Sequence, residues 1–373
     1  MMQRDNTFSI CKAIGIIMMV AYHAGMPTYT ARFVNEFIMP LFFMASGYFF
    51  STKYLDDEAT FIKKRLKGLY VPFIKWSAIF LILHNLMFTC GLLSEQVGNA
   101  TGGVTHPYSW HVFQQRLWNI LFSMSGYDEF LCGAYWFFRA LLVASIAYLV
   151  MFKLLTSLAK HFNKTWQPFT IPIIICISTL LIAAWQTAEG LKITTLIQGG
   201  YRDIMGVFFI GCGYLFRQAR ERYHINIANT AILLATTAIF SVYAPAGMVY
   251  HATFETFMKL PVPAVCGTLA IYNISWWIDK KDIPGKRFLI YCGNNTVYIL
   301  LLHFVAFKVA SMAKILYYGL EANQMGAFPV IKNQSPTDLF WIVYTVCGTG
   351  IPLLGIYLYR KISSKIAYRK DAS

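Results

Sequence analysis

Charged side chains are scarce in this chain, and carboxylates are scarcer than cations. Only 13% of the 373 residues are charged, whereas roughly 25% is typical of a soluble domain. The chain has 32 lysines and arginines but 17 aspartates and glutamates, and 57% of its residues are hydrophobic. This composition excludes an ordinary soluble domain and indicates an integral membrane protein.

Several familiar sequence features are also missing. The eight cysteines are scattered singly, with no Cys-x-x-Cys pair, so no metal or redox motif is predicted and we expect no metal. The chain has no tandem repeat, no low-complexity tract, and no hydrophilic stretch long enough for a separate soluble domain. The first apolar run is not followed by a small-residue cleavage site, so we interpret it as a retained span. We expect one transmembrane domain over residues 1–373, with a short basic cytoplasmic tail at 359–373.

Long apolar runs are what the sequence has in abundance. A spanning helix needs about twenty predominantly apolar residues, and ten segments come near this requirement. We therefore predict an all-α, polytopic fold with about ten transmembrane helices. The predicted spans cover residues 7–24, 33–50, 69–93, 134–158, 169–186, 203–216, 229–244, 253–278, 288–313 and 338–358.

Lysine and arginine are concentrated in alternate loops between these runs. The stretches 63–67, 280–287 and 360–370 are rich in cations, whereas the loops expected on the opposite side have few. The positive-inside rule then predicts that both termini are cytoplasmic. The same bias accounts for the formal net charge of +15, so we expect membrane lipids as partners and no nucleic acid.

Two histidines lie inside apolar runs and are the most informative residues of the chain. His23 ends the run 14–23, and His303 lies in the run 296–304. Ionisable side chains are rare within spans and mark functional sites, so both are candidate catalytic residues. At about 1.5 Å per residue, each lies roughly 22 to 24 Å from the cytoplasmic start of its span, in the outer half of the bilayer.

Three further ionisable residues are expected on the outer side, where they are candidate substrate-binding residues: Glu36, His84 and Arg139. If the helices form one bundle, His84 and Arg139 share a cavity with His23 and His303. Each has a simpler interpretation as well. His84 precedes Asn85 near a span end and suits the membrane interface, Arg139 suits snorkelling from an aromatic belt, and Glu36 suits a solvated carboxylate at the start of a span.

Five segments in order resemble the membrane-bound acyltransferase 3 family of integral-membrane O-acyltransferases. Lys12 and His23 are similar to that family's basic-x10-His signature in the first span. The other matches are a Pro-Leu-Phe-Phe run ending in Ser-Gly, a basic stretch before a proline, a Trp-Phe segment, and a late Gly-x-Asn-Thr pattern followed by Tyr-x-x-x-x-His. These four lie at residues 37–48, 63–72, 135–142 and 292–303.

The chain departs from the family pattern at three positions. Ser9 stands where the family often has aspartate, so a carboxylate partner for His23 is missing from its usual place. Gly68 replaces the second arginine of an Arg-x-x-Arg stretch. Ile38 stands where members related to fucose 4-O-acetylases often have histidine, so the resemblance extends to the family and not to that subgroup.

The resemblance implies transfer of an acyl group, most often acetyl, from cytoplasmic acetyl-CoA to a hydroxyl of a sugar or glycan at the outer side of the membrane. It also implies polysaccharide modification in a bacterial cytoplasmic (inner) membrane. The acceptor hydroxyl must lose a proton, and neutral imidazole suits this task because its reference pKa is about 6.5. His23 is the candidate general base; transient acylation of the same imidazole is the alternative.

The resemblance also assigns a site for the coenzyme. Cations in a narrow low-dielectric cleft attract phosphates strongly, which makes Lys12, Lys63, Lys64, Arg65 and Lys67 candidates for binding acyl-CoA. A basic run beside a span also occurs simply as a topology signal or as a contact for anionic lipid headgroups.

Two other classes of function remain open at this point. Buried histidine and arginine also mark transport pathways, so a transporter or flippase for a sugar-containing or lipid-linked substrate is the main alternative. It predicts paired half-repeats, which the sequence does not display. A non-catalytic protein of a polysaccharide-exporting complex is the third possibility, although it would need none of the five motifs.

Overall fold

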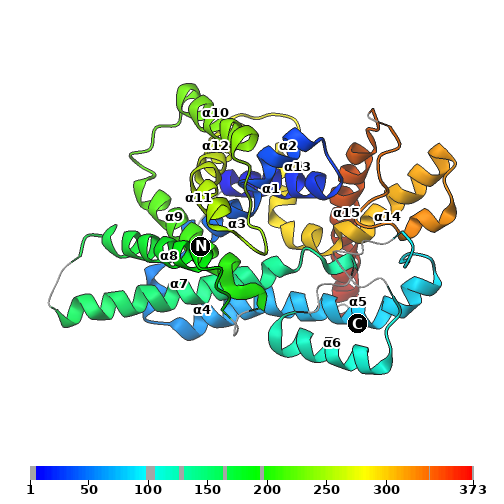
Figure 1. The fold of residues 1–373 in the computed structure, drawn as a ribbon, viewed down its shortest axis with the longest axis horizontal. Helices are drawn as coiled ribbons and strands as arrows, with labels where there is room; N and C mark the ends of the chain where they lie inside the picture. The colour runs from blue at the N-terminus through cyan, green and yellow to red at the C-terminus, as the bar shows by residue number, and fades with distance from the viewer. Residues whose placement is uncertain are drawn as a thin grey trace.

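The computed structural model describes residues 6–97, 106–125, 130–162, 166–193, 197–335 and 337–371. Within these ranges every regular element is a helix (Figure 1), which confirms the all-α prediction. Residues 1–5 and the last two residues of the predicted tail lie outside the described ranges.

The α-helices, in chain order, are α1 (Asn6–His23), α2 (Thr28–Asn35), α3 (Ile38–Tyr48), α4 (Glu58–Arg65), α5 (Val71–Thr89), α6 (Trp110–Ser123), α7 (Trp136–His161), α8 (Thr170–Ala188), α9 (Tyr201–Ala219), α10 (Ile227–Tyr243), α11 (Phe254–Lys259), α12 (Pro261–Lys280), α13 (Lys286–Asn294), α14 (Thr296–Tyr318) and α15 (Phe340–Asp371). Four short 3₁₀ turns are η1 (Thr52–Leu55), η3 (Phe130–Cys132), η4 (Ile197–Gly200) and η5 (Ala322–Gly326), and η2 (Leu66–Tyr70) is a π turn.

Six helical stretches in the described ranges are long and apolar enough to cross a membrane. They are Glu58–Thr89, Trp136–His161, Thr170–Ala188, Phe254–Lys280, Thr296–Tyr318 and Phe340–Ser364. Each of the ten predicted runs is largely helical, but 33–50, 253–278 and 288–313 each extend over two helices. Of the helices in these runs, α1, α3, α9 and α10 fall outside the set of six. The number of ten spans and the cytoplasmic termini therefore stay predictions.

Large apolar side chains cover much of the outer surface of the bundle. Leu181, Ile232 and Leu316 are 65%, 63% and 76% exposed, on three different helices. Exposed apolar area of this extent is unusual for a soluble protein, whereas hydrocarbon is its natural surrounding in a bilayer. The surface is that of a protein that lies in a membrane.

Helix α1 lies at the centre of the bundle (Figure 1). It contacts α2, α3, α12, α13, α14 and α15, and its residues from Thr7 to Ala21 are mostly buried. A helix surrounded by protein needs less apolar surface than one that faces lipid, which explains how α1 accommodates Lys12 and His23.

Two glycines allow α3 and α9 to cross closely. A Cβ atom added to Gly47 would lie 1.8 Å from the main-chain oxygen of Ile210, and one added to Gly213 would lie 1.9 Å from that of Met44. Only glycine fits at both positions, since backbones approach this closely only where the side chains are small. The Ser-Gly end of the second predicted span is thus a helix-packing contact.

A π turn interrupts the long helix Glu58–Thr89 just after Arg65. Pro72 has no N–H group, so it cannot bond to the carbonyl four residues earlier, and the chain widens into the π turn η2 at this point. Such turns are frequent at functional sites. Here the turn lies directly after the arginine of the basic cluster.

Candidate active site

The imidazoles of His23 and His303 meet at the centre of the bundle. The Nδ1 atom of His23 lies 3.0 Å from Nε2 of His303, although 280 positions separate the two residues in the chain. His23 is the last residue of α1 and is half-buried, whereas His303 lies within α14 and is fully buried. Phe304 packs against both rings, with centroids 5.1 and 4.0 Å away.

Hydrogen bonding determines where the protons of this pair lie. Nδ1 of His303 lies 3.1 Å from the carbonyl oxygen of Ile299 and 3.0 Å from that of Leu300. Carbonyls only accept, so Nδ1 of His303 donates, and in the neutral ring Nε2 accepts. Nδ1 of His23 therefore donates to His303, which leaves a lone pair on Nε2 of His23.

A cavity of about 210 Å³ contains His23, and we call it the outer cavity because the predicted topology places it on the non-cytoplasmic side. Tyr22, Asn35 and Arg202 supply its other polar side chains, beside the indole of Trp136. The guanidinium carbon of Arg202 lies 3.9 Å from the Trp136 ring centroid, and its Nε donates to the carbonyl of Met248 at 2.8 Å. The cavity therefore combines a base with a positioned cation and an amide.

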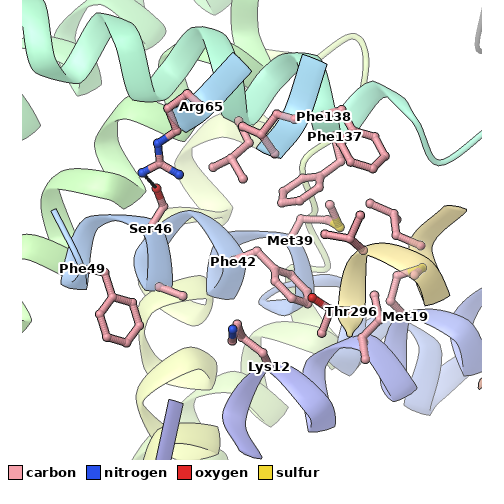
Figure 2. Close-up of a pocket in the computed structure, with 16 residues that line it drawn as sticks. Lys12, Met19, Met39, Phe42, Ser46, Phe49, Arg65, Phe137, Phe138 and Thr296 are labelled. Carbon is pink, nitrogen blue, oxygen red and sulfur yellow. Dashed lines mark hydrogen bonds between the residues drawn. The ribbon is translucent and has the colours of Figure 1, made fainter. Parts of the chain in front are cut away.

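A second cavity, of about 250 Å³, lies along α1 from Lys12 to Met19 and contains two of the predicted cations. We call it the inner cavity, because Lys12 lies toward the predicted cytoplasmic end of α1. Lys12 and Arg65 reach it from different sides, and Arg65 Nη2 donates to Ser46 Oγ at 2.8 Å (Figure 2). The rest of its lining is mostly apolar and includes Phe42, Phe137 and Phe138, with Thr296 as the other polar member. The cavity is therefore a narrow apolar passage with cations on its walls.

The two cavities adjoin within the bundle. Met19, Met39 and Leu300 belong to the lining of both. These three apolar side chains are the boundary that the two cavities share, which we call the partition, with Lys12 and Arg65 lining one cavity and the imidazole of His23 lining the other. Flexible methionine side chains make up two of its three members, and methionine adapts easily to a changing occupant.

A family model described as an acyltransferase domain matches residues 6–361. The chain belongs to the acyltransferase 3 family. Neither a curated protein nor a solved structure matches it. Family membership and the apolar helices together make the protein an integral membrane acyltransferase.

The structure separates the predicted site residues into distinct groups. His23 and His303 come together, whereas His84 does not join them. The ring of His84 stacks on Tyr108 with centroids 3.7 Å apart, and its Nε2 lies 3.1 Å from the carbonyl of His106. These contacts tie α5 to the segment before α6.

Arg139 and Glu36 are also placed differently from the expectation of one shared cavity. Arg139 is buried and pairs with Asp203 of α9 at 3.4 Å, and neither of the two cavities includes it in the described lining. Glu36 is not solvated but fully buried, and its carboxylate has no hydrogen-bond partner among the described residues. It directly follows Asn35 of the outer cavity.

The residues of the basic cluster 63–67 do not all reach the inner cavity either. Of Lys63, Lys64, Arg65 and Lys67, only Arg65 lines the inner cavity. The three lysines are exposed, and Lys64 bonds to the hydroxyl of Tyr54. Successive residues of a helix point in different directions, so a run of cations cannot all face one cavity.

Sequence reasoning missed Arg202 and Asn35 of the outer cavity. In the sequence, Arg202 served only to compare the numbers of basic residues in alternate loops. Asn35 belongs to no motif that would have marked it as a binding residue. The position of Arg202 at the start of a span, beside Asp203, was the one available signal, since paired charges near a span often serve a site.

Proposed function

We propose that the protein transfers an acetyl group from acetyl-CoA at the cytoplasmic face to a hydroxyl of a sugar or glycan at the outer face. The observation that carries this proposal is the contact of the two cavities at Met19, Met39 and Leu300. Membership of an acyltransferase family favours this reaction over the transporter alternative. The small size of both cavities favours acetyl over a long acyl chain.

Acetyl-CoA enters the inner cavity in this proposal. Lys12 and Arg65 bind its phosphates, since charge-assisted bonds to phosphate are strong in a low dielectric. The apolar lining then receives the pantetheine arm. Lys12 and His23 are separated by a rise of roughly 16 Å along α1, which an extended arm covers, so that the thioester reaches the partition beside His23.

The acceptor occupies the outer cavity, where Asn35 and Arg202 suit a ligand rich in hydroxyls. Nε2 of His23 takes the proton of the acceptor hydroxyl while the hydroxyl oxygen bonds to the carbonyl carbon of the thioester. The C–S bond then breaks, and the proton passes from His23 to the coenzyme A thiolate. His303 holds the His23 ring in place and accepts from its Nδ1 throughout. We place this reaction in a bacterial cytoplasmic membrane, with ten spans and both termini inside.

The experiment that tests the proposal blocks the contact between the cavities. The native protein in nanodiscs is expected to release coenzyme A from acetyl-CoA when a glycan acceptor pool is added. Met39→Trp fills the partition, so we expect it to bind acetyl-CoA within about threefold of the native affinity while its turnover falls at least tenfold, because orientation of the reactants is lost. Binding is measured by calorimetry and turnover by thiol release.

Met312→Trp is the matched control, because Met312 lies exposed on α14 away from both cavities, and it should behave as native. A Met39→Trp protein that turns over at the native rate contradicts the path between the cavities. If the native protein neither binds acetyl-CoA nor transfers its acetyl group, while vesicles containing it move a sugar substrate without any thioester, the transporter alternative replaces this proposal.

The role of His303 predicts a difference between two substitutions. His303→Gln retains a side-chain oxygen that can accept from Nδ1 of His23, whereas His303→Leu removes the acceptor. We expect kcat to fall about tenfold or less in the first variant and about 100-fold in the second, in the range typical of partners that orient a reactive group. Steady-state kinetics at constant pH measure this, and equal losses in both variants would contradict the orienting role.

A further inference from the structure

A groove of about 690 Å³ runs between α5, α14 and α15, apart from the two cavities of the active site. Helix α14 separates it from the inner cavity, because Thr296, Val297 and Leu300 line that cavity while other residues of α14 line the groove. The groove residues are Lys75, Trp76 and Ile79 of α5, Tyr298, Leu302, Val305, Ala306 and Val309 of α14, and Ile351, Pro352, Gly355, Ile356 and Tyr359 of α15.

The long side of this groove is apolar, and two of its walls are exposed over much of their length. The α14 members recur at helical spacing and form one stripe. The spans that form the other walls, Glu58–Thr89 and Phe340–Ser364, are the least buried of the six, at 28% and 33%. Gly355 contributes to the space, since an added Cβ would meet no atom within 4 Å. The groove therefore has the shape and polarity for a hydrocarbon chain.

One end of the groove is cationic. Lys75 lies in the second turn of α5 and Tyr298 in the first turn of α14, and both line the groove. The predicted topology begins both of these spans on the same side of the membrane. Arg360, next to Tyr359, places its guanidinium carbon 5.9 Å from the Tyr298 ring centroid. Lys75 and Arg360 are exposed, and neither forms an ion pair with a carboxylate among the described residues.

We propose that this groove binds an anionic phospholipid, with one acyl chain along α14 and the phosphate between Lys75 and Arg360. An apolar groove alone accepts any lipid chain, but basic residues at its interfacial end select a headgroup with net negative charge. The proposal is independent of the reaction, because none of its residues lines the active-site cavities.

Lipid titration by native mass spectrometry tests this. The full chain is purified in detergent, stripped of lipid, and titrated with phosphatidylglycerol or with phosphatidylcholine of the same acyl chains. We expect the native protein to bind phosphatidylglycerol roughly tenfold more tightly or better, in line with two interfacial cations. The double variant Lys75→Gln, Arg360→Gln should lose this preference without any change in packing.

Gly355→Phe tests the site of the chain and has a matched control. The new ring occupies the groove, so affinity for phosphatidylglycerol should fall at least tenfold. Gly350 lies on the same helix but outside the groove lining, and an added Cβ there also meets no atom within 4 Å. The Gly350→Phe variant should therefore bind phosphatidylglycerol with the native affinity. Both variants are compared only as monodisperse protein. Equal native affinity for the two lipids, or native binding by Gly355→Phe, would overturn the proposal.

Discussion

Replacing His23 with alanine is expected to lower kcat for acyl transfer by about 10² to 10⁴-fold, the usual contribution of a general base. The imidazole lines the outer cavity, and it follows Met19 of the partition by one helical turn of α1. Its removal leaves Lys12 and Arg65 in place, so affinity for acetyl-CoA should stay within about threefold. Thiol release gives the rate, and calorimetry gives the affinity.

His161→Ala is the matched control for this prediction. His161 is exposed at the end of α7, so its loss should leave both quantities unchanged. If His23→Ala turns over at more than a third of the native rate, His23 is not the base. If the thioester affinity falls with the rate, the inner cavity depends on His23 in a way that the proposed roles do not include.

A second large effect is expected at the C-terminal end of α14, where Lys314 and Asp338 form a buried ion pair. Their charged atoms lie 2.7 Å apart and both side chains are fully buried. Asp338 also accepts from the backbone N–H groups of Gln334 and Phe340. Asp338→Ala leaves the ammonium of Lys314 buried without its carboxylate, which costs about 3 to 5 kcal/mol of stability. The thermal unfolding midpoint in detergent measures this loss.

The paired replacement separates charge burial from packing. Lys314→Met with Asp338→Leu removes both charges, and such replacements are often neutral, so the midpoint should return most of the way to the native value. Asp282→Ala, at an exposed position, should have no effect. A native midpoint in Asp338→Ala alone would show that the pair contributes little to stability.

The loop held by this ion pair reaches the active site. Lys308 donates to the carbonyls of Met325 and Ala327, and the ring of the next residue, Phe328, lies 4.9 Å from Phe304. Phe304 in turn packs on both imidazoles. The lysines of α14 thus hold the loop that supports the histidine pair.

The sequence alone determined the helical class, the approximate place of the ten long apolar helical segments, and the family. It did not predict α6, which lies between two predicted spans, or the break between α13 and α14. Apolar runs and cation-rich loops are local properties, because each helix must satisfy its own backbone in a bilayer. His23 and His303 were visible for the same reason, since an ionisable ring in an apolar run is costly wherever that run packs. The basic-x10-His spacing then connected Lys12 and His23 on one helix.

Only the tertiary structure decided which of these residues meet. The sequence predicts how far along a helix a side chain lies, but neither the direction in which it points nor the neighbour that it faces. Close crossings such as that at Gly47 determine those directions. Helix packing brought His303 to His23 and turned His84 and Arg139 to other partners, although the sequence places all four toward the same side of the membrane. Packing also directed Arg65 alone into the inner cavity, although the sequence places it in one basic run with three lysines.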